Sequence, residues 1–139
     1  MYDKLLVAVD HSNVTERVLG AARDLALLSK GEVWVLHLHE REVLPRAGLV
    51  PAAEPAEGAR AEVDAMTEEL TAAGIKAHGV VRNTIFGYAA SEIVEDAKNL
   101  DVGVIIMGSR GLTDLAGLLL GSTAHKVIHL ADRPVLVVR

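Results

Sequence analysis

The chain has 139 residues, of which 50% are hydrophobic and 3% aromatic, and its formal net charge at neutral pH is −5. This length predicts a single domain over residues 1–139, and the acidic balance argues against nucleic acid or a membrane surface as a partner, since both attract a basic face. The sequence has no cysteine, no visible secretory signal and no apolar run of the ~18 residues that a membrane span requires, so we expect a cytoplasmic protein without disulfides.

The first half of the chain alternates apolar runs with one helical pattern. Residues 5–9 (LLVAV) predict a short buried strand, and apolar side chains then recur at helical spacing over residues 14–25. Residues 32–38 (EVWVLHL) predict the second strand. Prolines and glycines are concentrated in the following stretch, which predicts a long irregular loop with the character of disorder over about residues 40–57.

The second half continues the alternation. Apolar residues at helical spacing predict helices over residues 63–70, 90–97 and 122–131, and apolar runs predict strands over residues 75–81, 104–107 and 135–138. Ser122 can cap the last of these helices. Strands and helices that alternate in this way predict one α/β domain, a five-stranded open parallel sheet with helices on both faces.

A glycine-bearing segment follows the fourth predicted strand. Gly108 and Gly111 come directly after it, and Gly121, Ser122 and Thr123 stand at the start of the last predicted helix. This connection is about twice as long as the ~2–6 residues usual between strand and helix in such a fold. Glycines permit positive φ and close backbone approach, and a helix N-terminus favours an anion. The segment either wraps phosphate groups, or its glycines only turn the chain and its serine only caps the helix.

A carboxylate, Asp10, follows the first predicted strand directly. It could hydrogen-bond a ribose hydroxyl or hold a metal, although a turn with a helix cap is the commoner use of such a residue. The carboxyl ends of parallel strands meet at the edge where open α/β sheets bind ligands, so Asp10 and the glycine segment should lie close together. Neither the P-loop pattern nor G-x-G-x-x-G is present, which leaves a P-loop kinase or a Rossmann dehydrogenase without support.

Two histidine pairs raise the question of a metal site. His37 and His39 share one face of the second strand, where they could bind zinc or, more commonly, be buried strand residues. His125 and His129 are one turn apart on the last helix, which is more typical of a solvated helix face. No third ligand is indicated at a defined spacing, so we assign no metal ligands and no catalytic residue.

The spacing G-x2-G-x9-G-[ST], present as Gly108, Gly111, Gly121 and Ser122, resembles the ATP-binding signature of the universal stress protein family. The similarity spans the chain, in the segments LLVAVDHS, VIIMGSRG, GSTAHKVI and RPVLVV. It implies a Rossmann-like sheet in the strand order 3-2-1-4-5, a homodimer that we expect to form through the last strand, and ATP with Mg or Mn as the ligand. It implies a stress-response or signalling module; the alternative is a slow ATP hydrolase or a nucleotidyl- or phosphoryl-transfer enzyme that uses the same pocket.

The resemblance also implies roles for individual residues. It places Ala8 and Val9 on the pocket floor, Asp10 near the ribose or phosphates, and backbone groups of Leu38 against adenine. It places Met107, Gly108, Arg110 and Gly111 along the nucleotide, with the two glycines near the ribose and phosphates. Gly121, Ser122 and Thr123 are expected to hold the phosphate tail.

Overall fold

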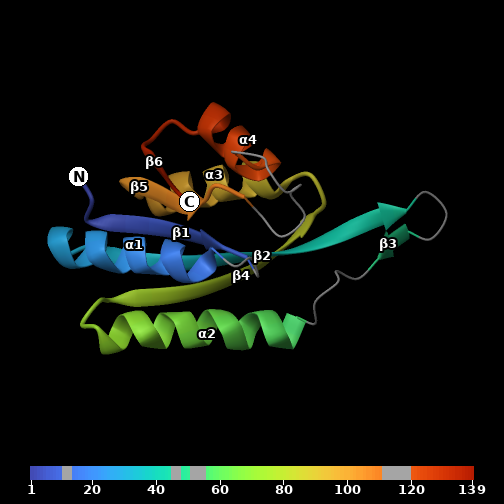
Figure 1. Ribbon diagram of the computed structural model, residues 1–139. Helices are drawn as coiled ribbons and strands as arrows, with labels where there is room; N and C mark the ends of the chain where they lie inside the picture. The colour runs from blue at the N-terminus through green and yellow to red at the C-terminus, as the bar shows by residue number, and fades with distance from the viewer. Residues whose placement is uncertain (11–13, 45–47, 51–55, 111–119) are drawn as a thin grey trace.

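Five parallel strands form the centre of the molecule in the computed structural model, which describes residues 1–10, 14–44, 48–50, 56–110 and 120–139 (Figure 1). They are β1 (Lys4–Val9), β2 (Glu32–Leu44), β4 (Ala77–Ile85), β5 (Val104–Gly108) and β6 (Val135–Val138). Their order across the sheet is β4-β2-β1-β5-β6, with parallel pairing throughout. Counted along the chain this is the order 3-2-1-4-5, so the predicted Rossmann-like fold is confirmed.

Two pairs of helices cover the two faces of this sheet (Figure 1). Helices α1 (Thr15–Ser29) and α2 (Ala56–Ala72) pack on one face, and α3 (Ala89–Leu100) and α4 (Ser122–Leu130) pack on the other. Within the described ranges, no helix combines the length and apolar character that a membrane crossing needs.

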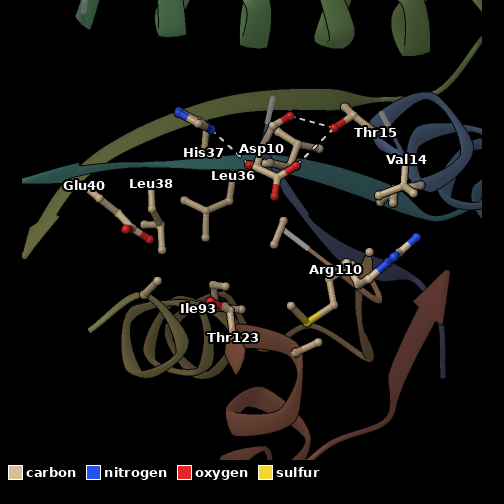
Figure 2. A pocket seen from close by; sticks show the side chains of 17 residues that line it. Asp10, Val14, Thr15, Leu36, His37, Leu38, Glu40, Ile93, Arg110 and Thr123 are labelled. Carbon is tan, nitrogen blue, oxygen red and sulfur yellow. Dashed lines mark hydrogen bonds between the residues drawn. The ribbon is translucent and has the colours of Figure 1, made fainter. Parts of the chain in front are cut away.

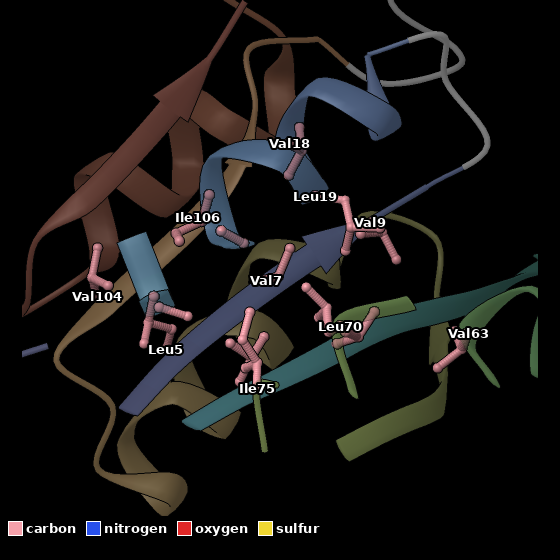
Figure 3. Packing of buried hydrophobic residues seen from close by; sticks show 14 of the residues in the cluster. Leu5, Val7, Val9, Val18, Leu19, Val63, Leu70, Ile75, Val104 and Ile106 are labelled. Carbon is pink, nitrogen blue, oxygen red and sulfur yellow. The ribbon is translucent and has the colours of Figure 1, made fainter. Parts of the chain in front are cut away.

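The hydrophobic core is divided by the sheet into two clusters. Side chains alternate between the faces of a strand, so Leu5 and Val7 of β1 pack under α1 and α2 (Figure 3), whereas Leu6 packs under α3 and α4. All three are fully buried. Burial on both faces explains why the strands read as continuous apolar runs in the sequence and not as alternating patterns.

The segment after the second predicted strand differs from the expectation. β2 does not end at residue 38 but continues to Leu44, where it pairs antiparallel with β3 (Gly48–Val50) and extends away from the sheet (Figure 1). The prediction of an irregular loop from residue 40 was therefore wrong for this part of the chain. The prolines that motivated it lie outside both strands, and the paired stretches contain the branched aliphatic residues that favour strands.

The third parallel strand is also displaced from its predicted position. It begins at Ala77 and ends at Ile85, whereas the prediction covered residues 75–81. Ile75 is buried in the turn after α2, which explains why its apolar side chain was taken for part of the strand. The far end of β4 follows the extension of β2, with Arg41 opposite Ile85 in the register.

Candidate functional site

A pocket lies at the carboxyl ends of β1 and β5 and beside residues 36–40 of β2, where the strand order reverses on either side of β1 (Figure 2). Eight of the predicted site residues line it: Ala8, Val9, Asp10, Leu38, Met107, Gly108, Arg110 and Thr123. They come from four separate segments of the chain, and the parallel sheet brings those segments to one edge. These eight residues therefore lie together around one pocket.

The interior of the pocket is largely apolar. Leu36 and Leu38 of β2, Ile93 of α3 and Met107 of β5 contribute side chains from three elements that are distant in sequence. Leu36, Ile93 and Met107 are buried, so these walls belong to the folded core and are formed in advance of any ligand. An apolar wall of this kind suits a flat, weakly polar group such as a nucleobase.

Asp10, one residue beyond β1, contributes a carboxylate to the lining of the pocket. The hydroxyl of Thr15 donates a hydrogen bond to the backbone carbonyl of Asp10 at 2.6 Å, and it lies 3.5 Å from the carboxylate oxygen Oδ1. Thr15 is the first residue of α1, so this contact joins the start of the helix to the end of the strand. The side chain of Thr15 therefore helps to hold the backbone of Asp10 in place.

Glu40 is a site residue that the sequence analysis missed. It lines the same pocket, is half-buried, and stands two residues after Leu38 on the same face of β2. Burial raises the pKa of the Glu40 carboxyl; the charge of His37 opposes this rise, and the negative charge of Asp10 adds to it. The signal that could have found it was strand alternation, which would have continued the predicted face of Leu38 into the segment taken for a loop.

The residues that were predicted to hold the phosphates do not all line the pocket. Thr123 lines the pocket, whereas Gly121 precedes α4 and Ser122 lines an adjoining hollow with Glu40, Phe86 and Lys126, among others. Gly111 lies outside the described residues. The described start of α4 therefore reaches the site through its first turn, whose free N–H groups favour an anion.

One expectation about this segment requires correction, and it concerns Ser122. Gly121 has φ −73° and ψ 164°, an extended conformation that any residue can adopt, and its N–H donates to the carbonyl of Ser109 at 2.5 Å. Ser122 is the first residue of α4 and makes no capping contact; Gly121 occupies the cap position. Among the described glycines, positive φ occurs at Gly74 and Gly87, away from the predicted loop.

Close approach, and not unusual backbone conformation, explains the glycine at position 108. A Cβ atom on Gly108 would lie 2.8 Å from Cγ2 of Val14 and 3.6 Å from Cγ2 of Val18. Both valines line the pocket from the side of α1. The missing side chain therefore lets the start of α1 pack directly on the end of β5.

The four histidines considered as metal ligands are placed as ordinary structural residues. His37 and His39 are buried strand residues: Nδ1 of His37 lies 3.0 Å from the Val9 carbonyl, and Nδ1 of His39 lies 3.2 Å from Oδ1 of Asn83. His125 and His129 are exposed on α4. In the described part of the chain, no three or more His, Cys, Asp or Glu side chains are grouped so that they could hold a metal ion.

An open parallel sheet in this order, with a pocket at the reversal of strand order, defines a doubly wound α/β domain. The chain matches the universal stress protein family model over residues 1–139 and belongs to this family. The family implied by the sequence motifs is thereby confirmed.

Relatives of similar length support this assignment. Universal stress protein YxiE of Bacillus subtilis is 34% identical over 151 aligned positions that span both chains completely. Universal stress protein MJ0577 of Methanocaldococcus jannaschii is 33% identical over 158 positions, covering all of this chain and 96% of that protein. The solved structure of MJ0577 matches with a TM-score of 0.81 at 29% identity, over 99% of this chain and 96% of that one. The universal stress protein of Archaeoglobus fulgidus, solved in complex with dAMP, gives a TM-score of 0.71 at 25% identity, over 99% and 98%.

Proposed function

We propose that this protein binds an adenine nucleotide, with ATP as the main ligand, and serves as a stress-response or signalling module. The observation that carries the proposal is the convergence of eight predicted residues from four segments on one preformed pocket. The A. fulgidus relative, which was solved with dAMP, adds support for an adenine nucleotide as the class of ligand.

The polarity of the pocket suggests how a nucleotide would lie in it. The base would pack against the apolar walls formed by Leu36, Ile93 and Met107, and the carboxylate of Asp10 would accept a hydrogen bond from a ribose hydroxyl. The phosphates would extend towards Arg110 and the first turn of α4, where positive charge and free N–H groups are available.

A divalent cation fits this arrangement only as part of the nucleotide complex. Mg²⁺ is typically held by one or two carboxylates together with phosphate oxygens and water, and Mn²⁺ accepts similar oxygen ligands. Asp10 is the carboxylate that would supply the protein ligand from beside the proposed phosphate path. The cation would neutralise phosphate charge there.

Two measurements test the proposal. Mass spectrometry of the gently purified protein should find a co-purified adenine nucleotide, and calorimetry should detect binding of ATP. Failure of ATP, ADP, AMP and adenosine to bind the nucleotide-free folded protein would overturn the proposal. For a binding module we expect phosphate release far below the ~10 s⁻¹ of ordinary enzymes, and a steady-state phosphate assay on the same samples that found a rate in that range would favour an enzyme instead.

An exposed cation in the pocket provides a variant that leaves the core intact. Arg110→Ala should weaken the binding of ATP by about 5- to 20-fold, because it removes a charge-assisted contact to phosphate. The affinity for adenosine should stay unchanged. Arg60→Ala, which removes an exposed arginine of α2 outside the pocket, is the matched control and should change neither affinity. If Arg110→Ala weakened the binding of ATP and of adenosine equally, the proposed path of the phosphates would be contradicted.

A further inference from the structure

Glu40 lies at one end of the pocket, and β2 forms this end. In Figure 2 it stands beside Leu38, with Asp10 between it and Arg110, which lies at the far side of the site. The pocket therefore carries a half-buried carboxylate at one end and an exposed guanidinium at the other. A phosphate chain that runs towards Arg110 leaves the end beside Glu40 to the base, although Glu40 also borders the start of α4 through the adjoining hollow.

The direction of the backbone groups beside Glu40 follows from the pairing of the strands. The N–H of Glu32 donates to the carbonyl of Asp3, directly before β1, so even-numbered residues at this point of β2 turn their backbone groups towards β1. The direction alternates along a strand, and the backbone groups of Leu38 and Glu40 consequently face the same side. β1 ends at Val9, so this edge of β2 meets the pocket where the neighbouring strand stops.

The edge of an adenine base matches these groups. Its 6-amino group donates hydrogen bonds, which a backbone carbonyl and a carboxylate can accept, and its N1 accepts one, which a backbone N–H can donate. A 6-oxo purine presents the reverse pattern, an oxygen at position 6 and a proton on N1. A carboxylate close to position 6 therefore distinguishes the two kinds of base by attraction to one and repulsion of the other.

We infer that Glu40 is a specificity-determining residue of this site, whose carboxylate accepts a hydrogen bond from the 6-amino group of adenine and repels 6-oxo purines. The inference rests on the proposed nucleotide-binding function and deepens it. Burial raises the pKa of Glu40, and a donor that satisfies the carboxylate would offset part of the cost of holding the charge there. Leu38 contributes backbone groups to the same edge, whereas Glu40 adds the charge that rejects the wrong base.

The decisive experiment compares ATP with ITP, which differ at this edge of the base. We expect the wild-type protein to favour ATP over ITP by at least about 10-fold, the range expected for one hydrogen bond to a charged group. In Glu40→Gln the amide can rotate to donate to the 6-oxo group, so the preference should fall below about 3-fold while ITP binds no worse than before. Glu95→Gln, which makes the same change on the exposed face of α3, should keep the wild-type ratio.

A measurement on the wild-type protein alone guards against a variant that folds poorly. Purine riboside triphosphate has hydrogen at position 6, so it loses the hydrogen bond without gaining the repulsion, and we expect affinities in the order ATP, purine riboside triphosphate, ITP. Equal binding of the three, tighter binding of GTP than of ATP, or an unchanged ATP-to-ITP ratio in Glu40→Gln would overturn the inference while the proposed function stands. Absence of ATP binding to the wild-type protein would overturn both.

Discussion

Gly108 illustrates how one missing side chain supports the site. Gly108→Ala would place a Cβ atom 2.8 Å from a methyl group of Val14, closer than packed carbon atoms approach, so either the Val14 side chain or the backbone around it must shift. We expect a loss of about 1–3 kcal/mol in the free energy of unfolding, as is usual for overpacking, together with weaker ATP binding. Urea denaturation and calorimetry measure the two effects.

The same substitution at Gly20 provides the control. Gly20 lies within α1, and nothing is found within 4 Å of the Cβ atom that alanine would add. Gly20→Ala should stabilise the protein by about 0.5–1 kcal/mol, because glycine loses more backbone entropy than alanine in a helix. If both variants changed stability in the same direction, close packing would not be the reason for glycine at position 108.

These residues also show what the sequence could and could not predict at this scale. The motif singled out Gly108, which lines the pocket, but the reason for glycine there lies in its distance to Val14, a contact that no local pattern contains. The sequence also suggested Ser122 as the cap of α4, whereas Gly121 occupies that position. Glu40 was missed because prolines further along the chain made its segment resemble a loop.

At the scale of elements, one ion pair holds the helix that forms a pocket wall. Asp96 of α3 is buried, and its Oδ2 lies 2.6 Å from Nε of Arg82 on β4. The same helix contributes Ala89 and Ile93 to the pocket. An acidic residue on the buried face of a predicted helix gave no indication of its partner, because the pairing depends on which strand lies beneath the helix.

We predict that removing one charge of this pair destabilises the protein more than removing both. Arg82→Met should cost about 1–3 kcal/mol, because a buried carboxylate loses its charged partner. Adding Asp96→Leu should recover part of that loss, since the double variant leaves no charge in the interface. Urea denaturation of the two single variants and the double variant gives the coupling energy, and strictly additive effects would contradict the assignment.

At the scale of the whole molecule, β6 occupies an edge of the sheet. In the described sheet it pairs with β5 on one side, and Leu136 is 40% exposed in this single chain. An apolar edge strand without charges or proline within it can pair with a second copy. Two-fold antiparallel pairing would satisfy both edges at once, so the predicted homodimer through the last strand stays a prediction of this fold.

Light scattering tests that prediction. The wild-type protein should be a dimer at micromolar concentration, and Leu136→Lys should shift it towards the monomer, because the lysine would stand at the paired edge. Leu28→Lys alters a side chain that is 84% exposed on α1 and should leave the dimer intact. A wild-type monomer at high micromolar concentration would refute the prediction.

The topology of the whole molecule was more predictable than its details. Alternating apolar runs and helical stripes determine the sequence of elements, and the family resemblance implied the strand order that the structure confirms. The extension of β2 and its pairing with β3 were not predicted, because three register pairs between short segments leave only a weak local signal. Patterns repeated over many residues were therefore informative, whereas contacts that depend on a few residues were not.

The central strand β1 pairs with β2, which is close to it in the sequence, and with β5, which is far from it in the sequence. Leu5 pairs with Val33, 28 positions further along, and with Val104, 99 positions further along. During synthesis, at about 5–20 residues per second, the apolar edge of β1 thus waits several seconds for the strand that covers it. The nascent chain is most prone to aggregate in this interval. The pocket between β1, β2 and β5 forms only after β5 has been synthesised and has paired with β1. A ligand can therefore stabilise the finished protein against aggregation but not the growing chain.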